Sequence, residues 1–195
     1  MSAETITAFA TLATVVVIGA SAVAALIQLR HMRASNQLEA VLSLERDFRS
    51  PEVQAALRYV QERLPARLED PDYRNELAVI GFVNTDVHPE LSACNWFNEM
   101  GTLLKHGLIS EDTFMDLFAR LIRYYWKALA PAVSIMRRSR GAGQYHDFEY
   151  LALRAEAWVE RYPHGYFPRG VARSALPDPW NEADARRASA TAPGE

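Results

Sequence analysis

The chain of 195 residues carries 21 basic and 24 acidic side chains, a formal net charge of −3 with neutral histidines. The two signs are interspersed rather than gathered into a basic face, so we expect no nucleic-acid binding. The single cysteine, Cys94, excludes an internal disulfide, and the composition therefore gives no indication of an oxidising compartment.

The first segment of the chain has no charged side chain from Thr5 to Leu29. As a helix, these 25 residues reach about 37 Å, enough to cross a hydrocarbon layer of about 30 Å with some tilt. We therefore predict a transmembrane helix over residues 1–29, with residues 6–29 in contact with the lipid bilayer.

Two alternatives for this segment remain open, an export signal and the buried helix of a soluble protein. Ala20-Ser21-Ala22 and Ala22-Val23-Ala24 have the small-x-small pattern of a cleavage site, but a signal peptide needs positive charges before its apolar run. Here Glu4 precedes the run, whereas Arg30 and Arg33 follow it. This order predicts a single-pass inner-membrane protein with its N-terminus outside and its C-terminal domain in the cytoplasm.

The helix is expected to continue through residues 30–50 as an amphipathic juxtamembrane segment. Apolar residues recur there at three-to-four spacing: Leu38, Val41, Leu42 and Phe48. The pattern ends near Ser50, where Ser50-Pro51-Glu52 combines an N-cap, a proline at the first helical position and an acid in the first turn. A new helix should begin there.

Residues 51–162 are predicted to form a cytosolic antiparallel helical bundle, and the whole chain to be all-α. Asp70-Pro71 marks a helix start, and we assign "YRNELAVIGFV" after it to a helix, although the pattern also fits a strand. His88-Pro89-Glu90 opens a helix that lasts to His106, with Gly107 as its left-handed end. Ser110 is the expected N-cap of the next helix.

That next helix is apolar over a wide arc, so it should be the central helix of the bundle. Its stripes are Phe114, Leu117, Phe118, Leu121 and Tyr125, with Ile122, Trp126 and Ala130 beside them. Pro131 is expected to kink or break it. The last amphipathic pattern carries Phe148, Leu151, Ala152, Ala155, Trp158, Val159 and Tyr162. Residues 163–195 are rich in proline and should be a mostly disordered tail.

The segment "NWFNEMGTLLKHGLISEDTFMDLFARLIRYYWKALAPAVSIMR" resembles a bacterial family catalogued as domain of unknown function 4760. The residues that carry the resemblance are Asn95, Glu99, Gly101, Gly107, Trp126, Pro131 and Arg137. The similarity covers approximately residues 5 to 160. It implies a membrane span joined to a helical cytosolic region, and it transfers no activity.

Glu99 is the carboxylate of greatest interest, because it lies on a strongly apolar helix beside Trp96. If it is partly buried, two interpretations compete. It is either an acid or base with a raised pKa, or one half of a structural ion pair with Arg123 or Arg137. We favour the ion pair, so Glu99→Gln should lower stability.

No residue is assigned to catalysis, to a cofactor or to a metal. The histidines His31, His88, His106, His146 and His164 lack zinc-site spacing. The spacing of His146 and Glu149 allows them to approach one another, but at a helix start we expect solvated caps. Cys94 is expected to be a small buried hydrophobe rather than a nucleophile. The Gly141–Gly143 loop after Arg137, Arg138 and Arg140 is either a phosphate-binding loop or a solvated helix end, and we favour the latter.

Self-association through the span is an open alternative, because Ala20 and Ala24, like Ser21 and Ala25, are small residues four apart. Trp180 is either a partner-binding motif or a residue folded onto the bundle. We expect a non-enzymatic binding or scaffolding protein at the membrane, whose protein partner the sequence does not identify. The alternatives are a membrane-tethered enzyme with a site near Glu99 and an oligomerising membrane-active effector.

Overall fold

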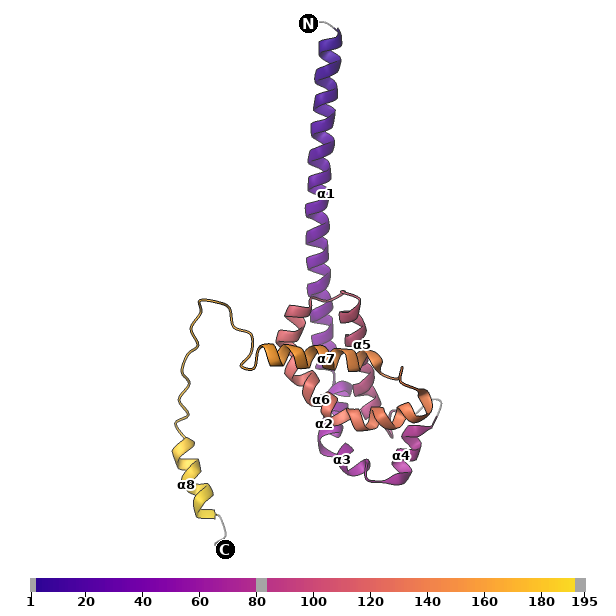
Figure 1. The fold of residues 1–195 in the computed structure, drawn as a ribbon, viewed down its shortest axis with the longest axis vertical. Coiled ribbons are helices and arrows are strands. Elements are labelled where there is room, and N and C mark those ends of the chain that lie inside the picture. Colours follow the sequence, from indigo (N-terminus) through magenta and orange to yellow (C-terminus); the bar gives the residue numbers. More distant parts are fainter. Residues whose placement is uncertain (1–2, 80–83, 192–195) are drawn as a thin grey trace. The chain divides into compact units, whose positions relative to one another are not determined.

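The computed structural model describes residues 3–79 and 84–191 (Figure 1), which form eight α-helices and no strand. The predicted all-α class is therefore confirmed. Contacts divide the chain into two compact units, Met1–Gly165 and Tyr166–Glu195.

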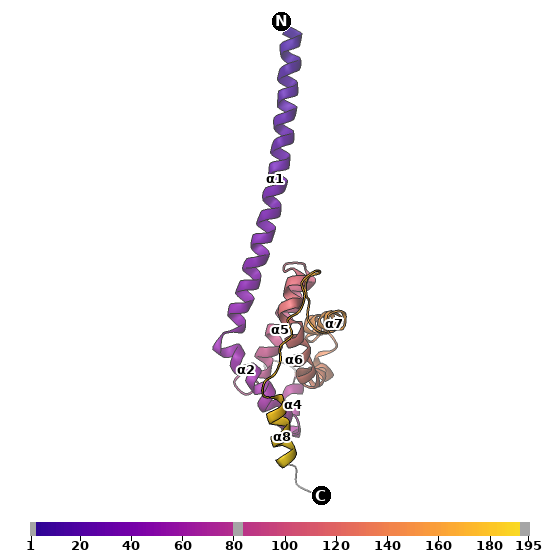
Figure 2. The same ribbon diagram turned by 90° about the vertical axis from the view of Figure 1, so that its left-hand side faces the viewer.

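Helix α1 (Ala3–Phe48) joins the predicted span and the juxtamembrane segment into one continuous helix. Its C-terminal end packs on the rest of the unit through Val41, Leu44 and Phe48, and the Phe48 ring lies 5.3 Å from the Trp96 ring. Figure 2 shows α5, α6 and α7 on one side of this end. Leu38 and Leu42 belong to the apolar pattern of the predicted amphipathic segment, but they are 61% and 51% exposed and lie outside the packed face. The packed face is rotated away from them.

Helix α2 (Pro51–Glu62) starts as predicted, because the Val53 N–H donates to Ser50 Oγ over 3.3 Å. A short helix α3 (Leu64–Arg67) follows. Helix α4 (Pro71–Ala78) starts after Asp70, whose carboxylate accepts the Asp72 N–H.

Helix α4 is shorter than predicted, because Val79 is already extended; Ile80 to Val83 lie outside the described residues. The carbonyl groups at its end are satisfied by α6 instead of by a further helical turn. Ser139 Oγ donates to the Ala78 carbonyl, and Arg140 Nη2 donates to the Val79 carbonyl over 2.9 Å. These distant partners end the helix.

Helices α5 (Glu90–Lys105) and α6 (Glu111–Arg140) run antiparallel, joined by a turn in which Gly107 has a φ of 66°. Ser110 occupies the predicted N-cap position of α6, but its side chain accepts no backbone N–H. Helix α6 contacts α2, α4, α5 and α7, which confirms it as the central helix.

Pro131 lies inside α6 and does not break it. Proline has no N–H for the Lys127 carbonyl and its ring crowds that carbonyl, so a bend is expected there. Figure 1 shows α6 changing direction along its length: its first part runs alongside α5, and its last part crosses the unit above α3 and α4.

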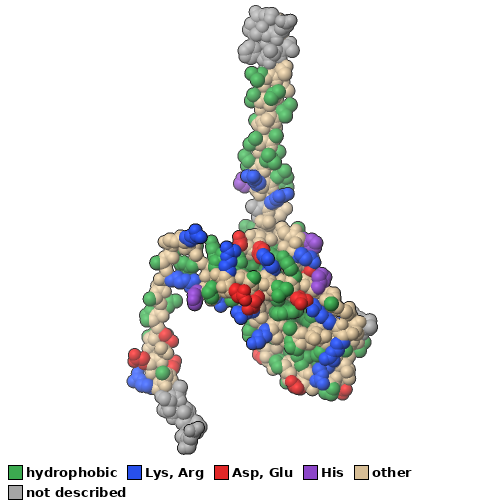
Figure 3. Space-filling view, in the orientation of Figure 1, with side chains coloured by type: hydrophobic (Ala, Val, Ile, Leu, Met, Phe, Trp, Pro, Cys, Tyr) green, Lys and Arg blue, Asp and Glu red, His purple; other side chains and the backbone are tan. Residues whose placement is uncertain are grey.

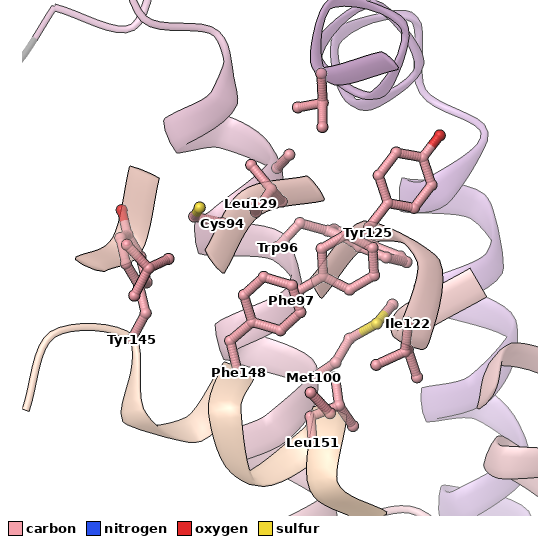
Figure 4. Packing of buried hydrophobic residues seen from close by; sticks show 14 of the residues in the cluster. Cys94, Trp96, Phe97, Met100, Ile122, Tyr125, Leu129, Tyr145, Phe148 and Leu151 are labelled. Carbon is pink, nitrogen blue, oxygen red and sulfur yellow. The ribbon is translucent and has the colours of Figure 1, made fainter. Parts of the chain in front are cut away.

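Helix α7 (His146–Arg161) crosses both α5 and α6. Trp158 and Tyr162 of the predicted stripe are half-buried, and Asp147 is buried in addition to the stripe. The other five residues of the stripe are buried as predicted: Phe148, Leu151, Ala152, Ala155 and Val159. In the core the rings of Phe97 and Phe148 stack with centroids 4.7 Å apart and an interplanar angle of 7° (Figure 4).

The second unit has no helix from Tyr166 to Trp180, in line with the prediction for the tail. Helix α8 (Asn181–Thr191) follows, and it was not predicted. Asp178 Oδ1 accepts the Trp180 N–H over 2.9 Å, and Glu182 and Asp184 lie in the first helical turn. Acidic residues at this end favour a helix locally, without apolar periodicity.

Candidate functional site

A line of polar side chains along α5 holds the first turn of α7. We call Asn95, Asn98, Thr102 and Lys105 the α5 polar stripe; their spacing places them on one side of the helix. Asn95 Oδ1 accepts the Tyr145 hydroxyl proton over 2.9 Å, and Asn98 Oδ1 accepts the Phe148 N–H over 3.2 Å.

Helix α7 needs this external capping. Its own N-cap residue is Tyr145, with a φ of 54°, and the tyrosine side chain makes no cap hydrogen bond. The first N–H groups of a helix have no partner within the helix. Asn98 supplies an acceptor from a neighbouring helix, so α7 begins where α5 satisfies it.

Asp147 is the charged centre of this junction, and its side chain is only 8% exposed. Thr102 Oγ1 donates to Asp147 Oδ2 over 2.7 Å, and Lys105 Nζ pairs with Asp147 Oδ1. Burial alone raises the pKa of this carboxyl, but the hydrogen bonds from Lys105 and Thr102 outweigh it and leave the pKa below its usual value. Asp147 is therefore a structural carboxylate.

Gly101 lets α5 and α7 approach within backbone contact. A β-carbon built on it would lie 2.0 Å from the Asp147 carbonyl oxygen and 3.2 Å from Asp147 Cβ. Any side chain at this position would push the two helices apart.

Helix α6 completes the junction from the other side. The Trp126 ring meets the Phe148 ring edge-on at 4.9 Å. Arg137 Nε donates to the Gln144 carbonyl over 2.9 Å, and Arg137 Nη2 pairs with Glu149 Oε2 over 2.8 Å. Four of the residues behind the family resemblance thus meet at the start of α7: Asn95, Gly101, Trp126 and Arg137.

A second polar cluster is centred on Glu90, which is fully buried at the start of α5. Tyr73 donates its hydroxyl proton to Glu90 Oε1 over 2.6 Å, and His88 Nδ1 lies 2.9 Å from the same oxygen. Tyr59 then donates to the Tyr73 oxygen over 3.1 Å. Glu90 Oε2 is also buried, and no described residue hydrogen-bonds to it.

His88 lies between two carboxyl groups, since Nε2 is 3.1 Å from Glu76 Oε2. A carboxylate only accepts hydrogen bonds, so either an imidazolium donates to both groups or one carboxyl carries a proton. The cluster is closed to substrates on the His88 and Glu90 side, because those residues are 2% and 0% exposed.

The Glu90 cluster also affects the pKa of the Cys94 thiol. Burial raises the pKa of the Cys94 thiol well above its usual value, and the nearby charge of Glu90 raises it further. The thiol therefore stays protonated, and the prediction of a small buried hydrophobe is confirmed. Burial and the hydrogen bond to Glu90 raise the pKa of Tyr73 in the same way.

Glu99 does not lie where the sequence interpretation placed it. The residue is exposed on α5, so the expectation that it is partly buried in an ion pair with Arg123 or Arg137 is wrong. Arg123 instead pairs with Glu156 over 2.7 Å, and Arg137 pairs with Glu149. The α5 helix turns Glu99 away from the face that contacts α7.

The remaining candidates are spread over the unit. His146 lies 3.2 Å from Asp147 Oδ1, whereas Glu149 pairs with Arg137, so His146 and Glu149 have separate partners. Arg137 and Arg140 bind carbonyl groups of the protein, which leaves them poorly placed for a phosphate at Gly141–Gly143. Among described residues, no group of three His, Cys, Asp or Glu side chains has metal-site geometry.

Sequence reasoning missed Glu90 and His88, because His88-Pro89-Glu90 reads simply as a helix start. The sequence signal that could have identified the cluster is Tyr73 at a buried helical position, together with Glu76 and Glu90 near His88. Only the fold, however, brings α4 against the start of α5. The α5 polar stripe was missed for the same reason.

Comparison with protein families gives a match over residues 15–155 to the family described as Domain of unknown function (DUF4760). The matched range contains both polar clusters and ends within α7. No curated protein and no solved structure matches this chain.

Proposed function

This chain belongs to the DUF4760 family, and we propose that it is a membrane-anchored protein whose helical domain binds partners at the cytoplasmic face. The observation that carries the proposal is the long apolar part of α1. By length and composition, α1 is the one helix in the described part of the chain that is able to cross a membrane.

The apolar side chains of this part of α1 are exposed, which is costly in water and favourable in lipid. Figure 3 shows hydrophobic side chains along the helix up to a group of basic and histidine side chains. The exposed fraction is between 51% and 64% for Leu12, Val15, Val16, Val17, Ile18, Val23, Leu26, Ile27 and Leu29.

The charges beside this segment support an orientation with the domain in the cytoplasm. Arg30 and Arg33 follow the apolar run directly, and positive residues favour the cytoplasmic flank of a span. Helix α1 then continues into the domain, where Val41, Leu44 and Phe48 are packed. The domain is thus held close to the membrane by a helix rather than by a flexible linker.

The polar groups of the domain favour binding over catalysis, because they are engaged in contacts within the protein. The α5 polar stripe is occupied in holding α7, and the Glu90 cluster is buried. The groove of about 640 Å³ between α6 and α7 is open, and apolar atoms of Trp126, Pro131 and Leu153 contribute to its lining. An enzyme site usually gathers several polar groups in an enclosed pocket.

Membrane attachment is tested by fractionating cells that express the full chain, with alkaline carbonate extraction of the pellet. We expect the chain to stay in the carbonate-resistant membrane fraction. Val17→Lys with Val23→Lys should release it, because a lysine at the centre of a span costs about 2.5 to 3.5 kcal/mol. The matched control is Val171→Lys with Leu176→Lys, two exposed apolar positions outside α1.

A wild-type chain that stays in the supernatant after ultracentrifugation would overturn the proposal, as would a mature N-terminus beyond Ala24. Orientation is tested with single cysteines in a Cys94→Ala background and a membrane-impermeant maleimide. We expect Ala3→Cys to react in intact spheroplasts and Ser174→Cys to react only after lysis. The opposite pattern would reverse the topology.

A further inference from the structure

Helix α1 presents an apolar face that its own domain does not cover. Val41 and Leu44 are 8% and 5% exposed and pack on the domain, whereas Leu38 and Leu42 are 61% and 51% exposed. These two leucines come after Arg30 and Arg33, so under the proposed function they lie in water rather than in lipid. Figure 2 shows the other helices of the unit on one side of α1, which leaves the opposite side open.

The same face continues into the membrane-spanning part of α1. Leu38 follows Ala20, and Leu42 follows Ala24, by 18 residues, which is about five full helical turns. The four residues therefore share one side of the helix, and we call them the outward seam. His31, seven residues before Leu38, lies on this side as well.

The basic residues lie elsewhere on the helix. Arg30 precedes Val41, and Arg33 precedes Leu44, by 11 residues, which is about three full turns. Both arginines therefore share the side that faces the domain. A helix that packs on the outward seam does not meet them.

We propose that the outward seam binds the outward seam of a second copy of this chain, with the two α1 helices parallel. This inference rests on the proposed function, because the membrane gives both copies the same direction and depth. Ala20 and Ala24 then meet their equivalents where small residues allow close approach, and Leu38 and Leu42 meet theirs outside the bilayer. The arginines of the two copies stay apart.

The seam is continuous with a groove on the domain. Glu45 follows Leu38 by seven residues, about two turns, and it lines a groove of about 590 Å³ together with Phe48, Arg49 and Leu117. Arg49 Nη2 pairs with Glu45 Oε1 over 2.5 Å, so the charges at this end are balanced in each copy. Leu117 is 61% exposed in this groove, so it is accessible to the second copy.

The test uses single cysteines in the full-length Cys94→Ala chain, oxidised with copper phenanthroline in native membranes. We expect Leu38→Cys and Leu42→Cys to give a disulfide-linked dimer several-fold more efficiently than Ser43→Cys, which is exposed on another side of α1. Adding Ala24→Phe should reduce the Leu42→Cys dimer several-fold, since a large side chain separates the helices at the seam.

Equal crosslinking at positions 42 and 43, or no dimer at either, would overturn the seam even if the chain fractionates with membranes. A crosslinked product with the mass of a different protein would also overturn it. A chain that is not membrane-bound would instead refute the proposed function, and fractionation measures that separately.

Discussion

The backbones of α5 and α7 meet where Gly101 faces the carbonyl oxygen of Asp147, at the position where a β-carbon on Gly101 would lie only 2.0 Å away. Around this contact Asn98, Thr102 and Lys105 bind the first turn of α7. The close approach of the two backbones at Gly101 therefore allows the hydrogen bonds between α5 and α7 to form.

Gly101→Ala should destabilise the protein by about 1 to 3 kcal/mol, because the added methyl group meets backbone atoms that cannot rotate away. The measurement is thermal unfolding of the full-length chain in detergent. Gly143→Ala is the control, since nothing lies within 4 Å of a β-carbon there. Equal melting temperatures for the two variants would contradict the close approach.

Asp147→Asn should lower the free energy of unfolding, by an amount that depends on pH. The folded-state pKa of Asp147 is lowered, so its contribution is fully present above the unfolded-state pKa of about 4 and is lost as pH falls through the folded value. The difference in melting temperature between wild type and Asp147→Asn should be large at pH 7 and should shrink toward pH 3. A difference that is constant over this range would exclude an ionised Asp147 paired with Lys105.

Tyr73→Phe should lower the free energy of unfolding by about 1 to 3 kcal/mol, because Glu90 loses a buried hydrogen bond. Denaturant unfolding followed by circular dichroism measures the change. Tyr124→Phe is the matched control: Tyr124 is 55% exposed, and its loss of a hydroxyl should stay within about 0.5 kcal/mol. If both variants show the same change in the free energy of unfolding, the Glu90 cluster does not stabilise the fold.

Cys94 should resist thiol reagents in the folded chain and react on unfolding. It is fully buried, and burial together with Glu90 raises its pKa, so little thiolate is present. The rate of maleimide labelling at pH 8, with and without denaturant, tests this. Ser174→Cys in a Cys94→Ala background provides the exposed reference, and similar rates for both thiols in the native state would contradict the burial.

Glu99→Gln should leave the melting temperature unchanged, because Glu99 is exposed and has no ion pair with Arg123 or Arg137. The neighbouring Asn98→Ala should cost about 1 kcal/mol, since it removes the acceptor that caps α7. A destabilised Glu99→Gln with a neutral Asn98→Ala would reverse the roles assigned to these two residues.

Local features of the sequence were sufficient to place most helix boundaries. Ser50, Asp70 and Gly107 act on their own backbone neighbours, so their effects depend little on the rest of the fold. The end of α4 was predicted wrongly because its last carbonyl groups are bound by Ser139 and Arg140, far away in the chain.

The sequence by itself determined the all-α class, the long apolar helix and most of the buried faces of α6 and α7, because periodicity and capping are local properties. Leu117, which belonged to the predicted stripe of α6, is 61% exposed. Only the tertiary structure decided which polar residues meet. It turned Glu99 to solvent, enclosed Glu90 with His88 and Tyr73, and left Leu38 and Leu42 facing outward. Such contacts depend on how helices rotate and cross when they pack, and that rotation is set by close approaches such as Gly101 on Asp147.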